Sequence, residues 1–426
     1  MVTLGVPMFF CKHIEKLKSH YKREKLEKNF DFITYDSARE VDADSWNDVL
    51  SGKNMYLDLN YLNLLENTPS KNFVSRYVIL FHNNKPSGIA YFQVIDFKAS
   101  VFGNILDSKV SQIKSHRAKL FEHYIDKSGD DVVMRLLTCG NNIVSGEHAF
   151  FFKEKLPISH QFKMVEELIE RIGKREKLRG KISAILVKDF YAPVKGTPKC
   201  FFNTDKYVEF SVEPNMVVDF PKGVNSLESY IALFSKKYRN RAKAILKSGE
   251  VLTVKQLTAE EIQAQHDNIY KLYEQVYNHA KFKLVKLPEN YFHECKRIFG
   301  NKFIFTAFYL NGVPVAFSSG INLNEGCLEA HYIGFDYNLN KEHELYQNIL
   351  YDFLKQAIEL NKQRLNLGRT AAEIKSTIGA KAQDLICYVR PQNTVSKVIL
   401  KPFISFLQPG EWIPRNPFKE EASLSF

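Results

Sequence analysis

Charged residues crowd around a glycine in the segment LNLGRTAAEIKSTIG, residues 365–379. The apolar run at its start predicts a short strand, and Gly368 at the end of that strand lets the backbone turn or approach a ligand closely. Arg369, Glu373 and Lys375 follow within a few residues. Sites in α/β folds lie where strands end, so the segment predicts a site in which Gly368, Arg369 and Lys375 bind a ligand. The alternative is an exposed, charged turn.

A second group of polar side chains lies in EAHYIGFDYN, residues 329–338, which reads as a strand. Tyr332 and Asp336, together with Glu373, are the candidates for moving protons, since a tyrosine or a carboxylate can act as a general acid or base. Alternation along a strand places His331 and Tyr332 on opposite faces, so at most one of them faces a given site. The alternative is that both are satisfied core residues.

Basic residues recur at helical spacing in SKKYRNRAKAILK, residues 235–247. Lys236, Arg239, Lys243 and Lys247 follow at i, i+3, i+7 and i+11, which places them on one stripe of a helix. The opposite face is apolar and would dock the helix on a core. Such a stripe can bind phosphates, with arginine the better bidentate partner; the alternative is a solvated face. The residues predicted to bind an anionic donor here are Lys236, Lys237, Arg239, Arg241 and Lys243.

The elements that would position these residues occur twice along the chain. In each half a helical segment is followed by a hairpin, a strand, a long helix and a further strand. The hairpins are the clearest echo: NNKPSGIAYFQV at 83–94 and NGVPVAFSSGI at 311–321. A chain of 426 residues is long for one core and comfortable for two. The sequence therefore predicts two α/β modules.

Composition narrows the class of protein. A net charge of +11 makes an anionic partner plausible without choosing one. The six cysteines form no CxxC pair, and no metal-spaced His/Cys set, P-loop, G-x-S-x-G or H-E-x-x-H motif occurs, so no metal is expected. We read no export signal at the N-terminus and no apolar run long enough to cross a membrane. A cytoplasmic protein, in peripheral contact with the inner face of an anionic membrane, is the expectation.

The order of elements resembles the GNAT acyltransferase core, and two such modules in tandem resemble the FemAB-like branch of that superfamily, which includes peptidoglycan-bridge aminoacyltransferases. Three stretches carry the resemblance: 227–251, 311–359 and 365–385. The fold class implied is α/β (α+β), with two tandem GNAT-like modules, each a mixed twisted sheet flanked by helices. The domains expected are a basic N-terminal segment, two modules and an apolar, aromatic tail, at 1–29, 30–205, 206–395 and 396–426.

The resemblance implies a bacterial N-acyltransferase that transfers an acyl or aminoacyl group to an amine by direct attack. Tyr332, Asp336 or Glu373 would then assist the proton transfers. No cofactor is expected to be tightly bound. Acyl-CoA, acyl carrier protein or aminoacyl-tRNA would be the co-substrate, and no DNA partner is expected.

One departure bears on the choice of donor. The segment 336–348 lacks the glycine-rich turn with which acetyl-CoA enzymes of this superfamily hold the pyrophosphate. We favour an acyl donor and an amino acid, amino lipid or cell-envelope precursor as acceptor. The alternatives are an aminoacyl-tRNA-dependent wall-bridge enzyme and a basic RNA- or membrane-binding adaptor without catalysis, which would use residues 12–28 and 236–247.

Overall fold

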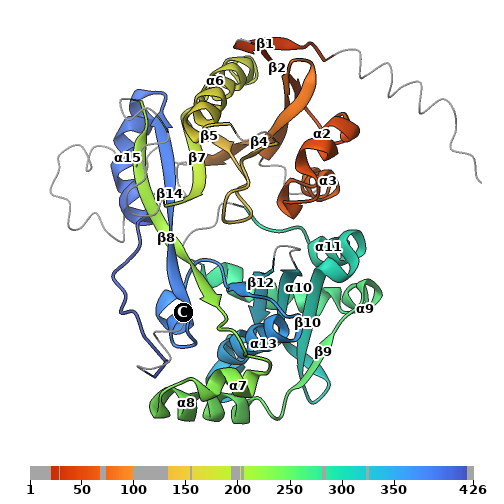
Figure 1. The fold of residues 1–426 in the computed structure, drawn as a ribbon, viewed down its shortest axis with the longest axis vertical. Coiled ribbons are helices and arrows are strands. Elements are labelled where there is room, and N and C mark those ends of the chain that lie inside the picture. Colours follow the sequence, from red (N-terminus) through yellow and green to blue (C-terminus); the bar gives the residue numbers. More distant parts are fainter. Residues whose placement is uncertain are drawn as a thin grey trace, which may run out of the picture. The chain divides into compact units, whose positions relative to one another are not determined.

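The computed structural model describes residues 21–27, 29–67, 73–98, 133–153, 156–192, 202, 206–280, 285–322 and 326–419. The chain divides into two compact units, each made of two stretches of sequence. The first is Met1–Val212 with Ile386–Gln408, and the second is Glu213–Leu385 with Pro409–Phe426 (Figure 1). Most of the basic segment 12–28 lies outside the described residues.

The first unit is a mixed sheet flanked by helices. Its strands follow the order β1 (Glu24–Glu27), β2 (Phe30–Tyr35), β3 (Phe73–His82), β4 (Lys85–Lys98), β5 (Val133–Cys139), β7 (Ala184–Tyr191) and the end of β14 (Lys381–Pro391). The short strand β6 (Phe150–Phe152) pairs with β4. Strands β5 and β7 are parallel. Its helices are α2 (Ala43–Leu50), η1 (Met55–Leu57), α3 (Leu59–Glu66), α6 (Ile158–Glu176) and α15 (Thr394–Leu407).

The second unit repeats this plan. Its strands are, in order, the start of β14, β8 (Val208–Asp219) from Glu213 onward, β13 (Arg364–Asn366), β12 (Cys327–Phe335), β11 (Val313–Asn322), β10 (Phe303–Leu310) and β9 (Thr253–Gln256). Strands β12 and β13 are the parallel pair. Its helices are α7 (Leu227–Ala232), α8 (Lys236–Ser248), α9 (Ala259–Ala264), α10 (His266–His279), α11 (Tyr291–Phe299), η3 (Gly300–Lys302), α12 (Tyr337–His343), α13 (Leu345–Glu359) and α14 (Ala372–Ser376).

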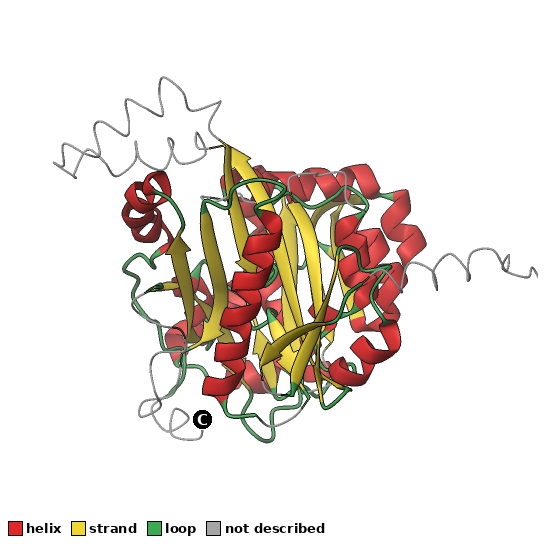
Figure 2. Cartoon of the chain, turned by 90° about the horizontal axis from the view of Figure 1, so that it is seen from above, coloured by secondary structure: helices red, strands yellow, loops and turns green. Residues whose placement is uncertain are grey.

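Helices pack on both faces of the sheet in the second unit. The alternating side chains of β12 show which helix covers which face. Helix α10 contacts β11 and β12, and α13 contacts β11, β12 and β13. Figure 2 shows helices, in red, packed against the yellow strands. Leu328 and Phe335 of β12 belong to the apolar cluster that α13 completes. Gly334, next to Phe335, instead faces the backbone of α10. Since neighbouring strand residues point to opposite faces, α10 and α13 cover opposite faces of the sheet.

The two hairpins that the sequence repeats are built around the same turn. Asn83 and Asn84 join β3 to β4 with φ of 48° and 68°, and Asn311 and Gly312 join β10 to β11 with φ of 51° and 81°. Two consecutive positive φ values in a two-residue loop define a type I′ turn, which asparagine and glycine tolerate best. The predicted echo between the hairpins therefore has a backbone cause.

Each hairpin also carries a β-bulge at the same distance from its turn. In the first, Phe81 pairs with Pro86 but Leu80 pairs with Gly88, which leaves Ser87 as the extra residue. In the second, Pro314 and Ala316 are the paired residues, and Val315 is the extra one. A proline two residues after the turn lacks the N–H that a regular ladder would use. The repeat thus extends to the irregularities of the sheet.

The segment expected as one C-terminal tail, 396–426, is divided between the units. Helix α15 belongs to the first, whereas residues 409–419 pack on the second. Phe418 contacts the rings of Tyr230 and Phe234 there, with centroid distances of 5.9 and 5.5 Å. The backbone N–H of Ser235 donates to Pro417 O at 2.8 Å. No helix among the described residues combines the length and apolarity needed to cross a membrane.

Candidate functional site

Strand β12 contains a bulge that changes which side chains share a face. Ser318 of β11 pairs with Ile333 and Gly320 pairs with Ala330, so His331 and Tyr332 together stand opposite Ser319. Ala330 and Ile333 both pack against the core beneath α13. His331 and Tyr332 therefore lie on the same face, toward α10 and α11, and their rings meet at 4.7 Å. The expectation that alternation separates these two residues is wrong, because the bulge inserts one residue into the period of two.

Ser319 stabilises this bulge from the neighbouring strand. Its hydroxyl accepts a hydrogen bond from the backbone N–H of Tyr332 at 3.0 Å and donates to Tyr332 O at 2.9 Å. Ser319 is fully buried, and the backbone groups of a bulge would otherwise lose their ladder partners. The glycine within β11, Gly320, was a usable signal, since glycine inside a strand often marks a bulge.

Aromatic side chains from α10 and α11 surround the bulged pair. The hydroxyl of Tyr291, on α11, lies 2.6 Å from His331 Nε2. The ring of Tyr332 lies 6.1 Å from that of Tyr291 and 6.0 Å from that of Tyr273, on α10. Burial raises the pKa of the Tyr332 hydroxyl well above its ordinary value, and the nearby Arg369 offsets part of the rise. Tyr332 therefore keeps its proton at neutral pH and can donate it.

Strands β12 and β13 separate just before this group. Their parallel pairing runs from Cys327 and Arg364 to Glu329 and Asn366. Beyond Asn366 the chain bonds to β8 instead: the N–H of Leu367 donates to Met216 O at 2.8 Å, and Gly368 O accepts from Met216 N–H at 3.0 Å. Beyond Glu329, β12 continues to Phe335, which pairs with Ala316 of β11. Residues 329–333 are all partly exposed, although they lie in a central strand.

The loop after β13 is strained, and Lys375 holds it. Gly368, Thr370 and Ala371 have φ of 67°, 69° and 50°, a conformation that costs energy in residues other than glycine. The Lys375 ammonium donates to Leu367 O at 2.8 Å, Gly368 O at 3.2 Å and Arg369 O at 2.6 Å. Lys375 is 5% exposed. We call this set of three bonds the Lys375 clamp.

The clamp matches the chemistry of an ammonium group. An ammonium has three N–H donors, and the three carbonyl oxygens of the clamp accept all of them. Burial lowers the pKa of Lys375 to about 7. Lys375 was predicted to bind ligand directly. In the structure it is committed to the backbone, and it would act on a ligand by fixing the loop that carries Arg369.

Both predicted catalytic carboxylates, Asp336 and Glu373, form structural contacts in the fold. The Asp336 side chain caps helix α12 by accepting from Asn338 N–H at 2.9 Å. Glu373 forms an ion pair with Arg415, whose Nε lies 3.0 Å from Glu373 Oε1. Of the residues proposed for proton transfer, Tyr332 is the one that the structure places beside His331 and near Arg369.

The predicted basic helix exists and docks as expected. Ala242 and Ile245 of α8 are buried, and Tyr238 packs against the same core. Arg241 Nη2 lies 3.3 Å from Gln347 Oε1, in the first turn of α13. The basic face of α8 therefore borders the start of α13, to which β12 leads through α12. The exposed basic residues of this face are Lys236, Lys237, Arg241, Lys243 and Lys247, and Arg239 is partly exposed.

In the first unit, the segment that follows β5 covers the end of the parallel strands that corresponds to the candidate site of the second unit. Strands β4 and β5 pair without a bulge. After the last β5–β7 pair the segment 140–149 folds back, and Tyr91 of β4 donates its N–H to Ala149 O at 2.8 Å. Lys188, on β7, is buried and donates to Asn141 O at 2.7 Å and Val144 O at 2.8 Å. The candidate site therefore lies in the second unit.

No protein-family model matches the sequence, and no curated protein sequence matches it. Solved structures with a similar fold include L-PGS from Bacillus licheniformis, at 12% identity over 68% of this chain and 97% of that one, with a TM-score of 0.41. FemX matches at 10% identity over 78% and 94%, with a TM-score of 0.45. A tandem GNAT protein from the clavulanic acid biosynthesis pathway matches at 7% identity over 85% and 98%, also with a TM-score of 0.45.

The structure is mixed α/β and consists of two units built on one plan. Each unit has the expected order of helices, hairpin, parallel strand pair and intervening long helix, α6 in the first and α13 in the second. The fold class expected from the sequence is confirmed. Within the described part of the chain, no three His, Cys, Asp or Glu side chains come together as metal ligands.

Proposed function

We propose that the second module transfers an acyl or aminoacyl group from an activated donor to an amine. The observation that carries the proposal is the bulge in β12, which brings His331 and Tyr332 together beside Tyr291. Bulges are over-represented next to active sites, where they re-aim side chains. The sequence resemblance to FemAB-like acyltransferases supports the same reaction class.

The reaction needs two proton transfers that this group can supply. The acceptor nitrogen attacks the acyl carbonyl carbon, a C–N bond forms, and the C–S or C–O bond to the donor breaks. His331, bonded to Tyr291, would take the proton that the amine loses. Tyr332, whose raised pKa keeps it protonated, would donate to the leaving sulfur or oxygen. Arg369 would stabilise the negative charge that develops on the carbonyl oxygen.

The donor would lie along β12 where that strand separates from β13. The basic residues of α8 beside the start of α13 would hold the phosphates that CoA, acyl carrier protein and tRNA share. An acyl donor from carrier protein or CoA stays our preference, and aminoacyl-tRNA is the alternative.

Comparative mass spectrometry tests the proposal. Lipid, muropeptide and small-molecule extracts from cells expressing the wild type, Tyr332→Phe or Arg369→Ala would be compared at equal protein level. The matched control is Tyr309→Phe, which removes a hydroxyl of β10 that donates to Gln265 at 2.8 Å. We expect a product that depends on Tyr332 and Arg369 and is unaffected in the control.

The mass increment of that product would identify the acyl group, and the extract that contains it would identify the acceptor class. A product made equally by wild type, Tyr332→Phe and Arg369→Ala would remove these residues from the mechanism. No product in any extract, combined with RNA or vesicle binding that weakens steeply with salt, would favour the adaptor.

A further inference from the structure

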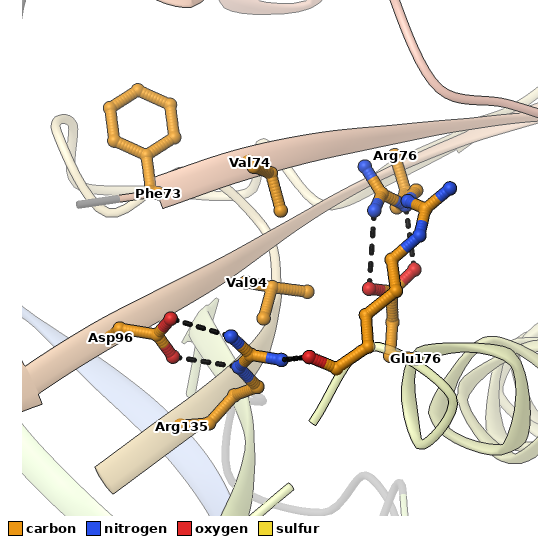
Figure 3. A pocket seen from close by; sticks show the side chains of 8 residues that line it. Phe73, Val74, Arg76, Val94, Asp96, Arg135 and Glu176 are labelled. Atoms are coloured by element: carbon orange, nitrogen blue, oxygen red, sulfur yellow. Dashed lines mark hydrogen bonds and ion pairs between the residues drawn. The ribbon is translucent and has the colours of Figure 1, made fainter. Parts of the chain in front are cut away.

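The first unit contains a small cavity that the proposed reaction does not use. It has a volume of about 160 Å³ and lies among β3, β4, β5 and the end of α6 (Figure 3). A cavity of about 150 Å³ can hold a molecule of the size of benzene, so this cavity has room for a ligand of several heavy atoms. Its lining is formed by Phe73, Val74, Arg76, Val94, Asp96, Arg135, Glu176 and Arg179.

A buried ion pair forms the inner wall. Arg76 and Glu176 have side chains that are 3% and 1% exposed, with Nε–Oε1 and Nη2–Oε2 distances of 2.7 and 3.1 Å. Replacing a buried ion pair by apolar side chains is often neutral or stabilising. Stability alone therefore explains this buried ion pair poorly. A ligand that interacts with a charged side chain of the pair would explain it better.

The charges around the cavity do not cancel. Asp36 accepts from Arg76, Arg175 and Arg179, at 3.3, 2.9 and 3.3 Å. Asp96 pairs with Arg135 at the mouth. With Glu176, three carboxylates face four guanidinium groups among these described residues, which leaves one positive charge in excess. This excess of positive charge favours an anionic ligand.

Arg135 has donors to offer at the mouth of the cavity. Its Nε and Nη2 bond to Asp96 at 2.7 and 2.6 Å, and its Nη1 donates to Arg179 O at 2.5 Å. An arginine carries five N–H donors, and these bonds use three of the five in Arg135. Figure 3 shows Arg135 and Arg76 on the two sides of the cavity, with Val74 and Val94 between them. Cationic and apolar groups thus line the same small space.

We propose that this cavity binds a small carboxylate that carries a short aliphatic group. The carboxylate would lie against Arg135 at the mouth, and the aliphatic part against Val74 and Val94. A simple branched acid and an α-amino acid share this chemistry. In the amino acid the ammonium would meet Asp96. The site does not depend on acyl transfer by the second module.

Calorimetric titration of the full-length protein tests the proposal with three ligands of similar shape: 4-methylpentanoate, its amide, and leucine. We expect the acid or leucine to bind at least about tenfold more tightly than the neutral amide. Tighter binding of leucine would assign the site to amino acids, and tighter binding of the acid would assign it to simple carboxylates. Equal binding of amide and acid, or no binding of either carboxylate, would overturn the proposal.

Two variants test whether the ligand binds at this cavity. Val74→Asp adds a negative charge at a residue that is 48% exposed, so we expect it to fold and to lose at least about tenfold in affinity. Its control is Val254→Asp, at a similarly exposed valine (49%) of the second unit, which should bind normally. Ligand should slow hydrogen exchange in 73–76 and 133–136. Unchanged affinity in Val74→Asp would refute binding at this cavity.

Discussion

The Lys375 clamp should control the local structure of its loop more than the stability of the whole protein. Replacing Lys375 by methionine keeps most of the side-chain volume and removes the three donors to Leu367, Gly368 and Arg369. Two opposing effects follow. The loop loses its bonds, and the protein no longer buries an ammonium group.

The magnitudes show which effect is visible in each measurement. Three hydrogen bonds from a charged donor are worth about 4–9 kcal/mol together. Burial lowers the pKa of Lys375 from 10.5 to about 7, and burying the ammonium therefore costs about 5 kcal/mol at 1.36 kcal/mol per pKa unit. The difference is between about 0 and 4 kcal/mol, so global stability should fall only modestly. Thr370 and Ala371, in strained conformations that cost about 1–3 kcal/mol each, are then free to relax.

Hydrogen exchange and urea unfolding separate the two effects. In Lys375→Met we expect exchange in residues 366–376 to accelerate by at least about tenfold, while the free energy of unfolding falls by less than about 4 kcal/mol. Lys355→Met, at an exposed lysine of α13, is the control and should change neither. Unaltered exchange in the loop of Lys375→Met would refute the clamp, and a larger global loss would refute the balance of energies.

Other residues give predictions of the same kind. Burial lowers the pKa of His148 to about 4, so the wild type should lose up to about 3 kcal/mol as pH falls from 6.5 to 4, and urea titrations of His148→Gln should show a flatter dependence. Burial raises the pKa of Asp352 to about 6; Asp352→Asn should therefore be about 1–3 kcal/mol more stable than wild type at pH 8, with the gain vanishing near pH 4. In Gly334→Ala the new Cβ would lie 2.7 Å from the α10 backbone, so thermal unfolding should show a loss of at least about 2 kcal/mol, whereas the unobstructed Gly410→Ala should be neutral. A stable Gly334→Ala would contradict the close packing of α10 on β12.

The sequence was most informative where local chemistry decides the structure. Asparagine and glycine at the hairpin tips identified both turns, because few other residues tolerate positive φ. Helical spacing identified α8 and its docking face, and the structure buries Ala242 and Ile245 as that spacing requires. The order of elements gave the tandem modules for the same reason: each element carries its own periodicity.

The site was harder to predict because its geometry depends on contacts distant in sequence. Alternation fails at His331 and Tyr332, since the bulge is stabilised by Ser319 on another strand. Lys375 is predicted to bind a ligand, yet the fold turns it inward to carbonyl oxygens six to eight residues earlier. Glu373 meets Arg415, a residue 42 positions away.

The interleaving of the two units along the chain affects how the protein is made. The first unit needs residues 386–408, and the second needs residues 409–418, including Phe418 of its core. During synthesis neither unit can complete its packing until the segments 386–408 and 409–418 have left the ribosome. A long nascent chain with two unfinished cores would depend on chaperones more than a string of independent domains does.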